Sequence, residues 1–485
     1  MGATRTGGGA AEDRDKHGCH IASELGLGMA YSLHRACDWE ESIMPGRLTR
    51  RRLLQLSGAS AATGGLAAIL ASGRAPAYAQ GTTVHWLKFV DFVPVSDQLI
   101  KGKIKDECQK ALGISLHAET IDGNGIQART TSAIQSGSGP DIIMEINNWP
   151  QLYADSVIDV SDIAEEVGQE QGGYYDTAKA VANDGKKWVA MPHTIIPNLL
   201  VNRTSWFADI GVTADNFPQT WDAYRDIGKK LKDKNRPYGQ TLAHTFGDAP
   251  NFWYPYLWSW GGKEVEADGK TVALNTKETL ESVKYAVEFW KDCYDSGGTS
   301  WDDAGNNRAF LASTISSTQN GASIYLLAKA KADTYLTETG KPIKDDTFHA
   351  PLPRGPAGHF SFHGPFSNII PGYSKNQKAA KDFLRWFRSK EIYDEWFISQ
   401  QGFSVGPTKV WQDHKMWQID PVMLPYRTAA QSGRFAGYAG PAGRAAAETI
   451  SKYIIVDMYA KAVEGMKAAD AVSWATGELQ KIYGA

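Results

Sequence analysis

The chain has 485 residues, a length that suits two or three domains rather than one. Hydrophobic residues make up 42% of the sequence, charged residues 22%, and the formal net charge is -3. This composition is typical of a soluble globular protein, and the lack of excess positive charge argues against nucleic acid as a partner.

The N-terminal region has the pattern of an export signal. Thr49–Gln55 is rich in arginine, Leu56–Leu70 is mildly apolar, and Ala77–Ala79 is a small-x-small cleavage site. This order predicts a cleaved signal peptide over residues 44–79, and the paired arginines resemble a twin-arginine signal. The alternative is a membrane anchor, but the apolar stretch is too short and too interrupted to span ~30 Å of bilayer.

Met44 stands at the start of this signal, so residues 1–43 are predicted to be a mis-called start or a non-structural leader. No Cys follows the cleavage site, so a lipid-anchored N-terminus is not expected and we place the mature protein free in the periplasm. Cys108 and Cys293 could form one disulfide in that compartment. Both fall in predicted helices far apart in sequence, which favours buried free thiols.

Residues 83–146 alternate between strand and helix patterns. The pattern predicts strands at 83–91, 114–119 and 141–146, with helices between them at 96–112 (capped by Ser96, closed by Gly113) and 127–135. This β-α-β-α-β order predicts a doubly wound α/β sheet, and the nearly all-apolar third strand is expected to be central and parallel.

Ligands of doubly wound sheets bind beyond the carboxyl ends of the strands. Asn147 and Asn148 could instead simply end their strand, whereas Trp149 is expected in the cleft because an exposed Trp needs a reason. The residues that follow the three strands, and that are therefore candidates for ligand contact, are Asp91, Asp122, Asn124, Asn147, Asn148 and Trp149.

The rest of the chain continues to mix strands and helices, with no internal repeat. Thr220 is expected to cap a helix, Asp268-Gly269 to form a hairpin turn, and the Pro- and Gly-rich residues 351–365 and 405–407 to cross between lobes. Other expected elements are strands at 187–192, 198–202 and 366–371, helices at 277–294 and 379–387, a helix, strand and second helix over 310–325, and a largely helical 443–485.

The stretch Asn251–Gly262 contains six aromatic side chains. It is either a wholly buried helix or a helix with one buried face and one face lining a ligand cleft, where flat rings stack on a sugar. Residues three and four apart share a helix face. We predict the second arrangement, with Trp253 or Trp258 stacked on the ligand and the other ring facing inward.

Several segments together resemble extracellular solute-binding proteins of ABC transporters, maltose-binding type (solute-binding protein family 1). No single segment is decisive, but their order and spacing are specific. These segments are Ser136–Ile143, Tyr153–Ile158, Asp184–Pro192, Leu199–Arg203, Pro218–Asp222, Ile315–Tyr325 and Lys375–Leu384.

The resemblance implies a class II periplasmic binding protein fold, with two doubly wound α/β lobes joined by chain crossings. Lobe 1 is expected at 83–196 plus 347–400, and lobe 2 at 197–346 plus 401–485. It further implies a monomer that binds a small solute in the cleft, most plausibly a sugar, oligosaccharide or polyol. The protein would deliver that solute unchanged to ABC permease subunits, without a cofactor.

Carried over by position, the resemblance places Glu145 to Trp149 at the first lobe's ligand wall and Asn251 to Tyr254 where an aromatic ring stacks on sugar. Ser323 and Ile196 stand where the maltodextrin binder has Trp and Glu, which argues against maltodextrin itself. The full set of expected ligand-binding residues is Asp91, Asn124, Asn147, Asn148, Trp149, His193, Asn251, Trp253, Trp258, Asn320, Ser323 and Tyr325.

Two other classes of function stay open at this point. A glycosidase or lyase needs two carboxylates about 5–9 Å apart, and no pattern pairs Glu145, Asp248 or Glu264. A sensor-coupled binding protein would have the same sequence features as a transport component. His359 and His363 have a zinc-like spacing, but Pro and Gly around them disfavour the helix that such a site needs, so no metal is expected.

Overall fold

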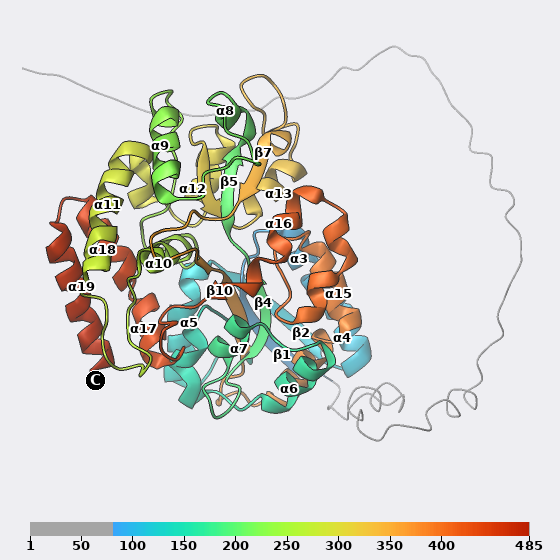
Figure 1. Cartoon of the computed structure of the whole chain (residues 1–485). Helices are drawn as coiled ribbons and strands as arrows, with labels where there is room; N and C mark the ends of the chain where they lie inside the picture. Colours follow the sequence, from blue (N-terminus) through green and yellow to red (C-terminus); the bar gives the residue numbers. More distant parts are fainter. Residues whose placement is uncertain (1–80, 485) are drawn as a thin grey trace, which may run out of the picture. The chain divides into compact units, whose positions relative to one another are not determined.

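The structure, a computed structural model, describes residues 81–484. The predicted leader and signal peptide therefore lie outside the described residues. The described residues all belong to one unit of the chain, which contains a five-stranded sheet, a three-stranded sheet and a pair of two-residue strands. We call the part around the larger sheet the first lobe and the part around the smaller sheet the second lobe (Figure 1).

The larger sheet has five strands in the order β2-β1-β3-β9-β4. Strand β1 pairs in parallel with both β2 and β3, whereas β9 runs antiparallel to β3 and β4. All residues of β3 are buried, as its apolar sequence predicts. The doubly wound α/β sheet is confirmed, and β3 is central but parallel on only one side. The strands are β1 (Thr83–Phe89), β2 (Ser115–Ile121), β3 (Ile142–Ile146), β4 (Met191–Ile196) and β9 (Gly364–Ile369).

The helix between β1 and β2 starts earlier than the sequence predicts. It consists of α3 (Pro94–Leu99), a π-helical turn η1 (Ile100–Ile104) and α4 (Lys105–Leu112). Ser96 does not cap it, because proline fits the first helical turn and the Ser96 hydroxyl donates to Asp91 instead. Gly113 closes it in the left-handed conformation, with φ 72°, as predicted.

The smaller sheet has three strands in the order β6-β5-β7, with β5 antiparallel to both neighbours. These are β5 (Leu199–Arg203), β6 (Ser317–Asn320) and β7 (Thr347–Ala350). Residue 347 was expected to begin the return to lobe 1, but β7 pairs with β5 and so belongs to the second lobe. The other expected lobe boundaries stay a proposal.

The aromatic stretch forms α10 (Asp248–Trp260), which packs against α11 (Lys277–Cys293) and α18 (Ile454–Val463). Every residue of α10 from Asp248 to Ser259 is buried. The double glycine ends the helix, with Gly261 in the left-handed conformation.

Both candidate tryptophans of α10 lie in the core. Trp253 stacks on Tyr459 at a ring-centroid distance of 4.8 Å and donates its indole N–H to the carbonyl of Thr241. Trp258 packs on Phe362 and donates to Glu264 Oε2 over 3.1 Å. The expectation that one of these rings faces the cleft is therefore wrong, because each indole N–H already has a partner inside the lobe and each ring is enclosed by other rings.

The remaining helices cover the two sheets and the C-terminal part of the chain. Thr220 caps α9 as predicted, accepting from the amide of Ala223. The α-helices are α5 (Gly123–Ser136), α6 (Ser161–Glu170), α7 (Asp176–Ala182), α8 (Thr204–Ala208), α9 (Trp221–Lys232), α12 (Gly305–Leu311), α13 (Ser323–Ala330), α14 (Gln377–Phe387), α15 (Lys390–Ser399), α16 (Leu424–Arg427), α17 (Arg444–Ser451) and α19 (Ala468–Tyr483).

Short elements complete the described chain. The strands β8 (Ser361–Phe362) and β10 (Gly433–Arg434) pair with each other. The 3-10 helices are η2 (Trp149–Ser156), η3 (Ser296–Ser300), η4 (Ile343–Asp346), η5 (Lys409–Asp413), η6 (Lys415–Gln418), η7 (Pro421–Met423) and η8 (Ala429–Gln431).

The chain segments that join the two lobes are bonded to one another. Only Pro197 and Asn198 separate β4 of the larger sheet from β5 of the smaller one. The amide of Asn198 donates to His363 Nδ1 on the returning segment, and Ile195 exchanges two backbone hydrogen bonds with Val405 on a third segment. We call these bonded segments the joint.

The two cysteines in the described residues, Cys108 and Cys293, are buried free thiols, as the sequence analysis favoured. Across the described part of the chain, no helix combines the length and apolar character needed to cross a membrane.

Candidate functional site

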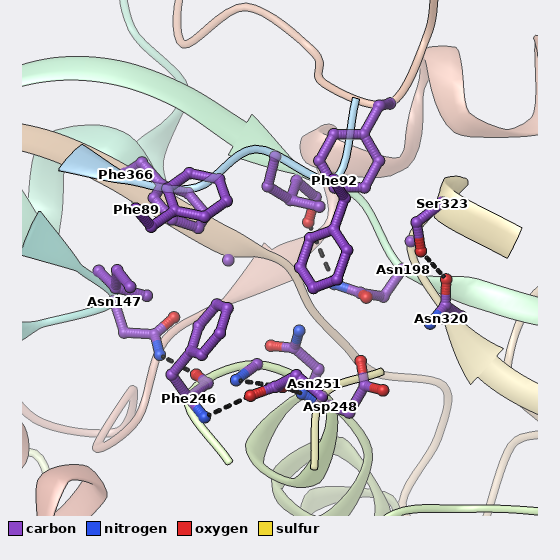
Figure 2. A pocket seen from close by; sticks show the side chains of 17 residues that line it. Phe89, Phe92, Asn147, Asn198, Phe246, Asp248, Asn251, Asn320, Ser323 and Phe366 are labelled. Carbon is purple, nitrogen blue, oxygen red and sulfur yellow. Dashed lines mark hydrogen bonds between the residues drawn. The ribbon is translucent and has the colours of Figure 1, made fainter. Parts of the chain in front are cut away.

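A pocket of about 490 Å³, counting its part open to solvent, lies between the two sheets (Figure 2). Phe89, Asn147 and Phe366 from the larger sheet's edge form one side, and Asn320 and Ser323 from the second lobe form another. The joint contributes Ile196, Asn198 and Phe403, and the start of α10 contributes Asp248 and Asn251.

Five phenylalanines supply most of the apolar lining. The rings of Phe89 and Phe366 lie 4.9 Å apart between centroids, and Phe246 lies 6.2 Å from Phe89. Across the pocket, Phe92 and Phe403 are 6.1 Å apart. Such rings offer flat faces but no hydrogen bonds, so orientation of a ligand depends on the polar residues between them.

Asn147 enters the pocket because the chain turns sharply at the end of β3. Its backbone is left-handed, with φ 54°, a conformation that asparagine tolerates better than most residues. Its side-chain Nδ2 donates to the carbonyl of Phe246 over 3.1 Å. The carbonyl oxygen Oδ1 is buried and has no hydrogen-bond partner within residues 81–484.

The first turn of α10 brings Asp248 and Asn251 to the same pocket. Asp248 Oδ2 and Asn251 Oδ1 are both buried, and neither has a partner in the described part of the chain. Asp303 stands beside them and accepts the backbone N–H groups of Phe246, Gly247 and Asp248 at 3.1, 3.0 and 2.9 Å. Asp303 therefore takes up the unpaired donors at the N-terminus of α10.

Both carboxyl groups have raised pKa values. Burial raises the pKa of Asp303 to about 6, although its three backbone donors act in the opposite direction. Burial also raises the pKa of Asp248 well above its usual range, and the neighbouring charge of Asp303 raises it further. Both effects favour the protonated form of Asp248 when no cation accompanies it.

On the second-lobe side, three polar residues are bonded to one another. Asn320 Nδ2 donates to Asn307 Oδ1, Asn307 Nδ2 donates to Ser323 Oγ, and Ser323 Oγ donates to Asn320 Oδ1, at 2.8, 2.9 and 2.7 Å. The ring of bonds fixes the orientations of Asn320 and Ser323. Asn320 and Ser323 are therefore held in place by hydrogen bonds within the protein, whereas Asn147, Asp248 and Asn251 each have an oxygen without a partner among the described residues.

Asp91 and Asn124, two of the predicted residues, line an adjoining depression that shares Phe89, Phe92 and Phe246 with the pocket. Asn124 is exposed there. Asp91 is buried, and its carboxylate accepts from the amide of Val93, from Ser96 and from Gln400, which commits it to holding the local chain.

Three other predicted residues serve the fold near the pocket without lining it. Asn148 donates to the carbonyl of Ala436, and Tyr325 donates its hydroxyl to Asp420. Trp149 is buried at the start of η2. With Trp253 and Trp258 in the core, the predicted residues that line the pocket are Asn147, Asn251, Asn320 and Ser323.

His193 lies within β4 and not in the pocket. Its ring packs among Trp86, Phe387 and Trp396. Burial holds the pKa of His193 well below its usual range, and the nearby charge of Arg388 acts in the same direction. The imidazole is therefore a neutral member of the first lobe's core.

The sequence analysis missed the phenylalanines and the carboxyl pair. Phe89 and Phe92 flank the carboxyl end of β1, which is the signal that could have identified them. Asp248 and Asp303 are separated by two helices and a 3-10 turn, and nothing in their spacing predicts the contact. Among residues 81–484, no group of three or more His, Cys, Asp or Glu side chains is placed to hold a metal ion.

Comparison with known proteins agrees with this architecture. A search of curated protein sequences found no match. Solved structures that are similar include maltose-bound MalE3 of T. maritima (18% identity, TM-score 0.69, covering 82% of this chain and 99% of that one). A solute-binding protein of Thermotoga lettingae bound with α-D-tagatose is also similar (18%, TM-score 0.68, 84% and 100%). So is the GacH receptor of Streptomyces glaucescens, solved unliganded and with acarbose (17%, TM-score 0.69, 84% and 99%).

Likeness at these identities shows the fold. The family assignment comes from the sequence, because the profile described as "Bacterial extracellular solute-binding protein" matches residues 103–425. That match covers more than half of the chain and includes every strand of the larger and smaller sheets except β1. The chain belongs to the bacterial extracellular solute-binding protein family.

Proposed function

We propose that this protein captures a sugar, oligosaccharide or polyol in the pocket between its lobes and delivers it to the membrane subunits of an ABC importer. The observation that carries the proposal is the composition of the pocket. Flat phenylalanine faces alternate there with buried amide and carboxyl oxygens, and the residues come from both lobes and the joint. A sugar ring has apolar C–H faces and a rim of hydroxyls, which match these two kinds of surface.

The structural neighbours support the same class of ligand. The ligands in these structures are maltose, α-D-tagatose, acarbose and, in a protein of Agrobacterium radiobacter, ribitol. These are sugars, a sugar-like inhibitor and a polyol. The absence of a tryptophan from the pocket lining favours a smaller solute than a long maltodextrin, which would need larger stacking surfaces.

The structure brings two carboxyl groups together, those of Asp248 and Asp303, as a glycosidase would need. Their arrangement does not suit hydrolysis. Asp303 uses both of its oxygens to accept the backbone N–H groups at the start of α10. Asp248 stands on the same wall, whereas a glycosidase places its two carboxyl groups on either side of the scissile bond. We therefore favour binding without turnover.

We also propose that the mature protein acts in the periplasm after removal of residues 44–79. The family is extracellular, and the predicted signal supports export. Intact-mass measurement of the periplasmic protein should give an N-terminus at Gln80. Retention of residues 44–79 would contradict this part of the proposal, and export of an Arg50→Lys, Arg51→Lys variant at the normal level would contradict the twin-arginine assignment.

A ligand screen tests the central proposal. Thermal shift against monosaccharides, disaccharides, polyols and amino acids should identify a stabilising solute, because a ligand that binds only the native state raises its stability. Mass spectrometry should then recover that solute unchanged after incubation. A stabilising amino acid, with no effect of any sugar or polyol, would contradict the ligand class, and product formation at substoichiometric protein would favour an enzyme.

A further inference from the structure

The pocket contains an excess of buried hydrogen-bond acceptors. Asn147, Asp248 and Asn251 are 2%, 8% and 5% exposed, and each presents one oxygen that has no partner among residues 81–484. Buried polar atoms are almost always satisfied, so these oxygens require donors. A ligand that fills this side of the pocket must therefore bring several N–H or O–H groups together.

A hydrogen bond of the protein fixes one of these oxygens as an acceptor. Asn147 Nδ2 donates to the carbonyl of Phe246, which cannot itself donate, so Asn147 Oδ1 must face the pocket. An ionised Asp248 has only acceptor oxygens. The side chain of Asn251 stands next to Asp248 on α10 and completes the group (Figure 2).

No positively charged side chain lies among these acceptor oxygens. The pocket lining contains no Lys, Arg or His, and the adjoining depression adds Asp91, Asp122 and Asp302, again without a basic residue. The N-terminus of α10, which would otherwise attract an anion, is occupied by Asp303. Acidic sugars and sugar phosphates therefore meet no counter-charge here.

The aromatic side chains that line the pocket can also bind a positively charged group of a ligand. The faces of Phe89, Phe246 and Phe92 border the same space as Asp248. A cation within ~6 Å of a ring centroid is attracted by the negative face of the ring. Phenylalanine can make this interaction without competing for the hydrogen bonds of the cation.

We propose that the cleft selects a sugar or polyol that carries a protonated amino group, with Asp248 as the counter-ion and the oxygens of Asn147 and Asn251 as further acceptors. An ammonium group has three N–H donors and no acceptor, which matches a pocket lining whose unpaired polar atoms are oxygens. This inference rests on the proposed function and narrows its ligand class.

Proton release is a second consequence. Burial and the charge of Asp303 raise the pKa of Asp248 in the free protein, and an ammonium ion beside Asp248 would lower that pKa, so binding favours release of a proton. The charged groups that face Asp248 are Asp303 and, farther out, Asp302, which is paired with Arg308 at 2.7 Å. Both acids disfavour a second negative charge, so an amino ligand should bind more tightly as pH rises while its own amine stays protonated.

The test compares matched ligands by calorimetry at about pH 6 and about pH 7. The pairs are glucosamine with glucose and galactosamine with galactose. We expect at least one amino sugar to bind about tenfold or more tightly than its neutral partner. Its binding should release protons, visible as a dependence of the measured heat on the ionisation heat of the buffer.

Substitution of Asp248 tests whether this residue causes the preference for the amino sugar. Asp248→Asn should abolish the preference for the amino sugar and the proton release. Asp333→Asn, at an exposed position of the second lobe, is the matched control and should change neither. If Asp248→Asn fails to fold, the proton release of the wild type remains a direct test.

The outcomes separate the two proposals. Binding of a neutral sugar as tight as that of its amino partner, or binding of the amino sugar without proton release, overturns this inference and leaves the proposed function intact. If none of the four sugars binds while another neutral sugar or polyol from the wider screen does, the inference is again overturned alone. If no sugar or polyol binds at all, both fail.

Discussion

Glu145 is a buried carboxyl group whose protonation should govern the pH dependence of folding. It lies on β3 in the middle of the larger sheet, and burial raises its pKa to about 8. Thr130 Oγ1 lies 2.6 Å from Glu145 Oε1 and 3.0 Å from the carbonyl of Ile126. One hydroxyl proton cannot serve both acceptors, but a protonated Glu145 can donate to Thr130 while Thr130 donates to Ile126.

The size of this pH dependence follows from the pKa values of Glu145 in the unfolded and the folded protein. The ordinary pKa of the carboxyl is 4.5 and the folded value is about 8. Between them the native state holds one proton that the unfolded chain has lost, so stability falls as pH rises, by ~1.4 kcal/mol per pH unit. The contribution of Glu145 to the free energy of unfolding is fully present below the pKa that this residue has in the unfolded chain. About 5 kcal/mol of it is lost once the pH has risen past the pKa that the residue has in the folded protein.

Glu145→Gln should remove this dependence, because the amide mimics the protonated acid and its N–H can donate to Thr130. The free energy of unfolding, measured by urea titration from about pH 5 to about pH 8, should be similar for both proteins at the acid end. At the alkaline end the variant should be more stable by several kcal/mol. Glu464→Gln, at an exposed position, is the control and should follow the wild type throughout.

Parallel curves for wild type and Glu145→Gln would refute the reasoning. They would mean that Glu145 ionises in the folded protein without cost, through water or a neighbour that the described contacts do not include. A variant that is less stable at every pH would instead show that the carboxyl geometry matters more than its protonation.

Three further outcomes are expected. Trp253→Ala and Trp258→Ala should each lower the free energy of unfolding, measured by urea titration, by ~3–5 kcal/mol. Ligand affinity, measured by calorimetry, should stay within about threefold of the wild type. A loss of affinity without a loss of stability would instead show that these rings contact the ligand. Asn251→Ala should weaken ligand binding about ten- to hundredfold with little change in melting temperature. Gly298→Ala should destabilise the second lobe, since its Cβ would stand 2.1 Å from the carbonyl oxygen of Gln240, whereas Gly477→Ala, with nothing within 4 Å on α19, should not.

The sequence predicted the first lobe well because its information is local. Apolar runs, the Gly113 stop and the strand–helix alternation specify the larger sheet, and the residues at strand ends follow from its topology. Asn147 could be placed in the pocket for this reason. Pro94 shows the limit, since its preference for the first helical turn moved the start of α3 ahead of the expected cap at Ser96.

The site was harder to predict where it depends on contacts between distant elements. Six aromatics on α10 looked like a stacking surface, but Tyr459 and Phe362, far along the chain, enclose Trp253 and Trp258. The rings that do line the pocket are isolated phenylalanines, which have no sequence pattern. Asp248 and Asp303 meet only because the loop before α12 folds onto the start of α10.

The joint has a consequence for how this protein could be tuned. Three chain segments cross between the lobes side by side, held by the bond from Asn198 to His363 and by the paired bonds of Ile195 and Val405. We expect the lobes to close on the ligand by rotating about these segments. Apparent affinity is the intrinsic affinity scaled by the fraction of molecules able to close. Changes at His363 or Val405 would therefore strengthen or weaken binding of every solute by the same factor, while the choice among solutes stays with the pocket.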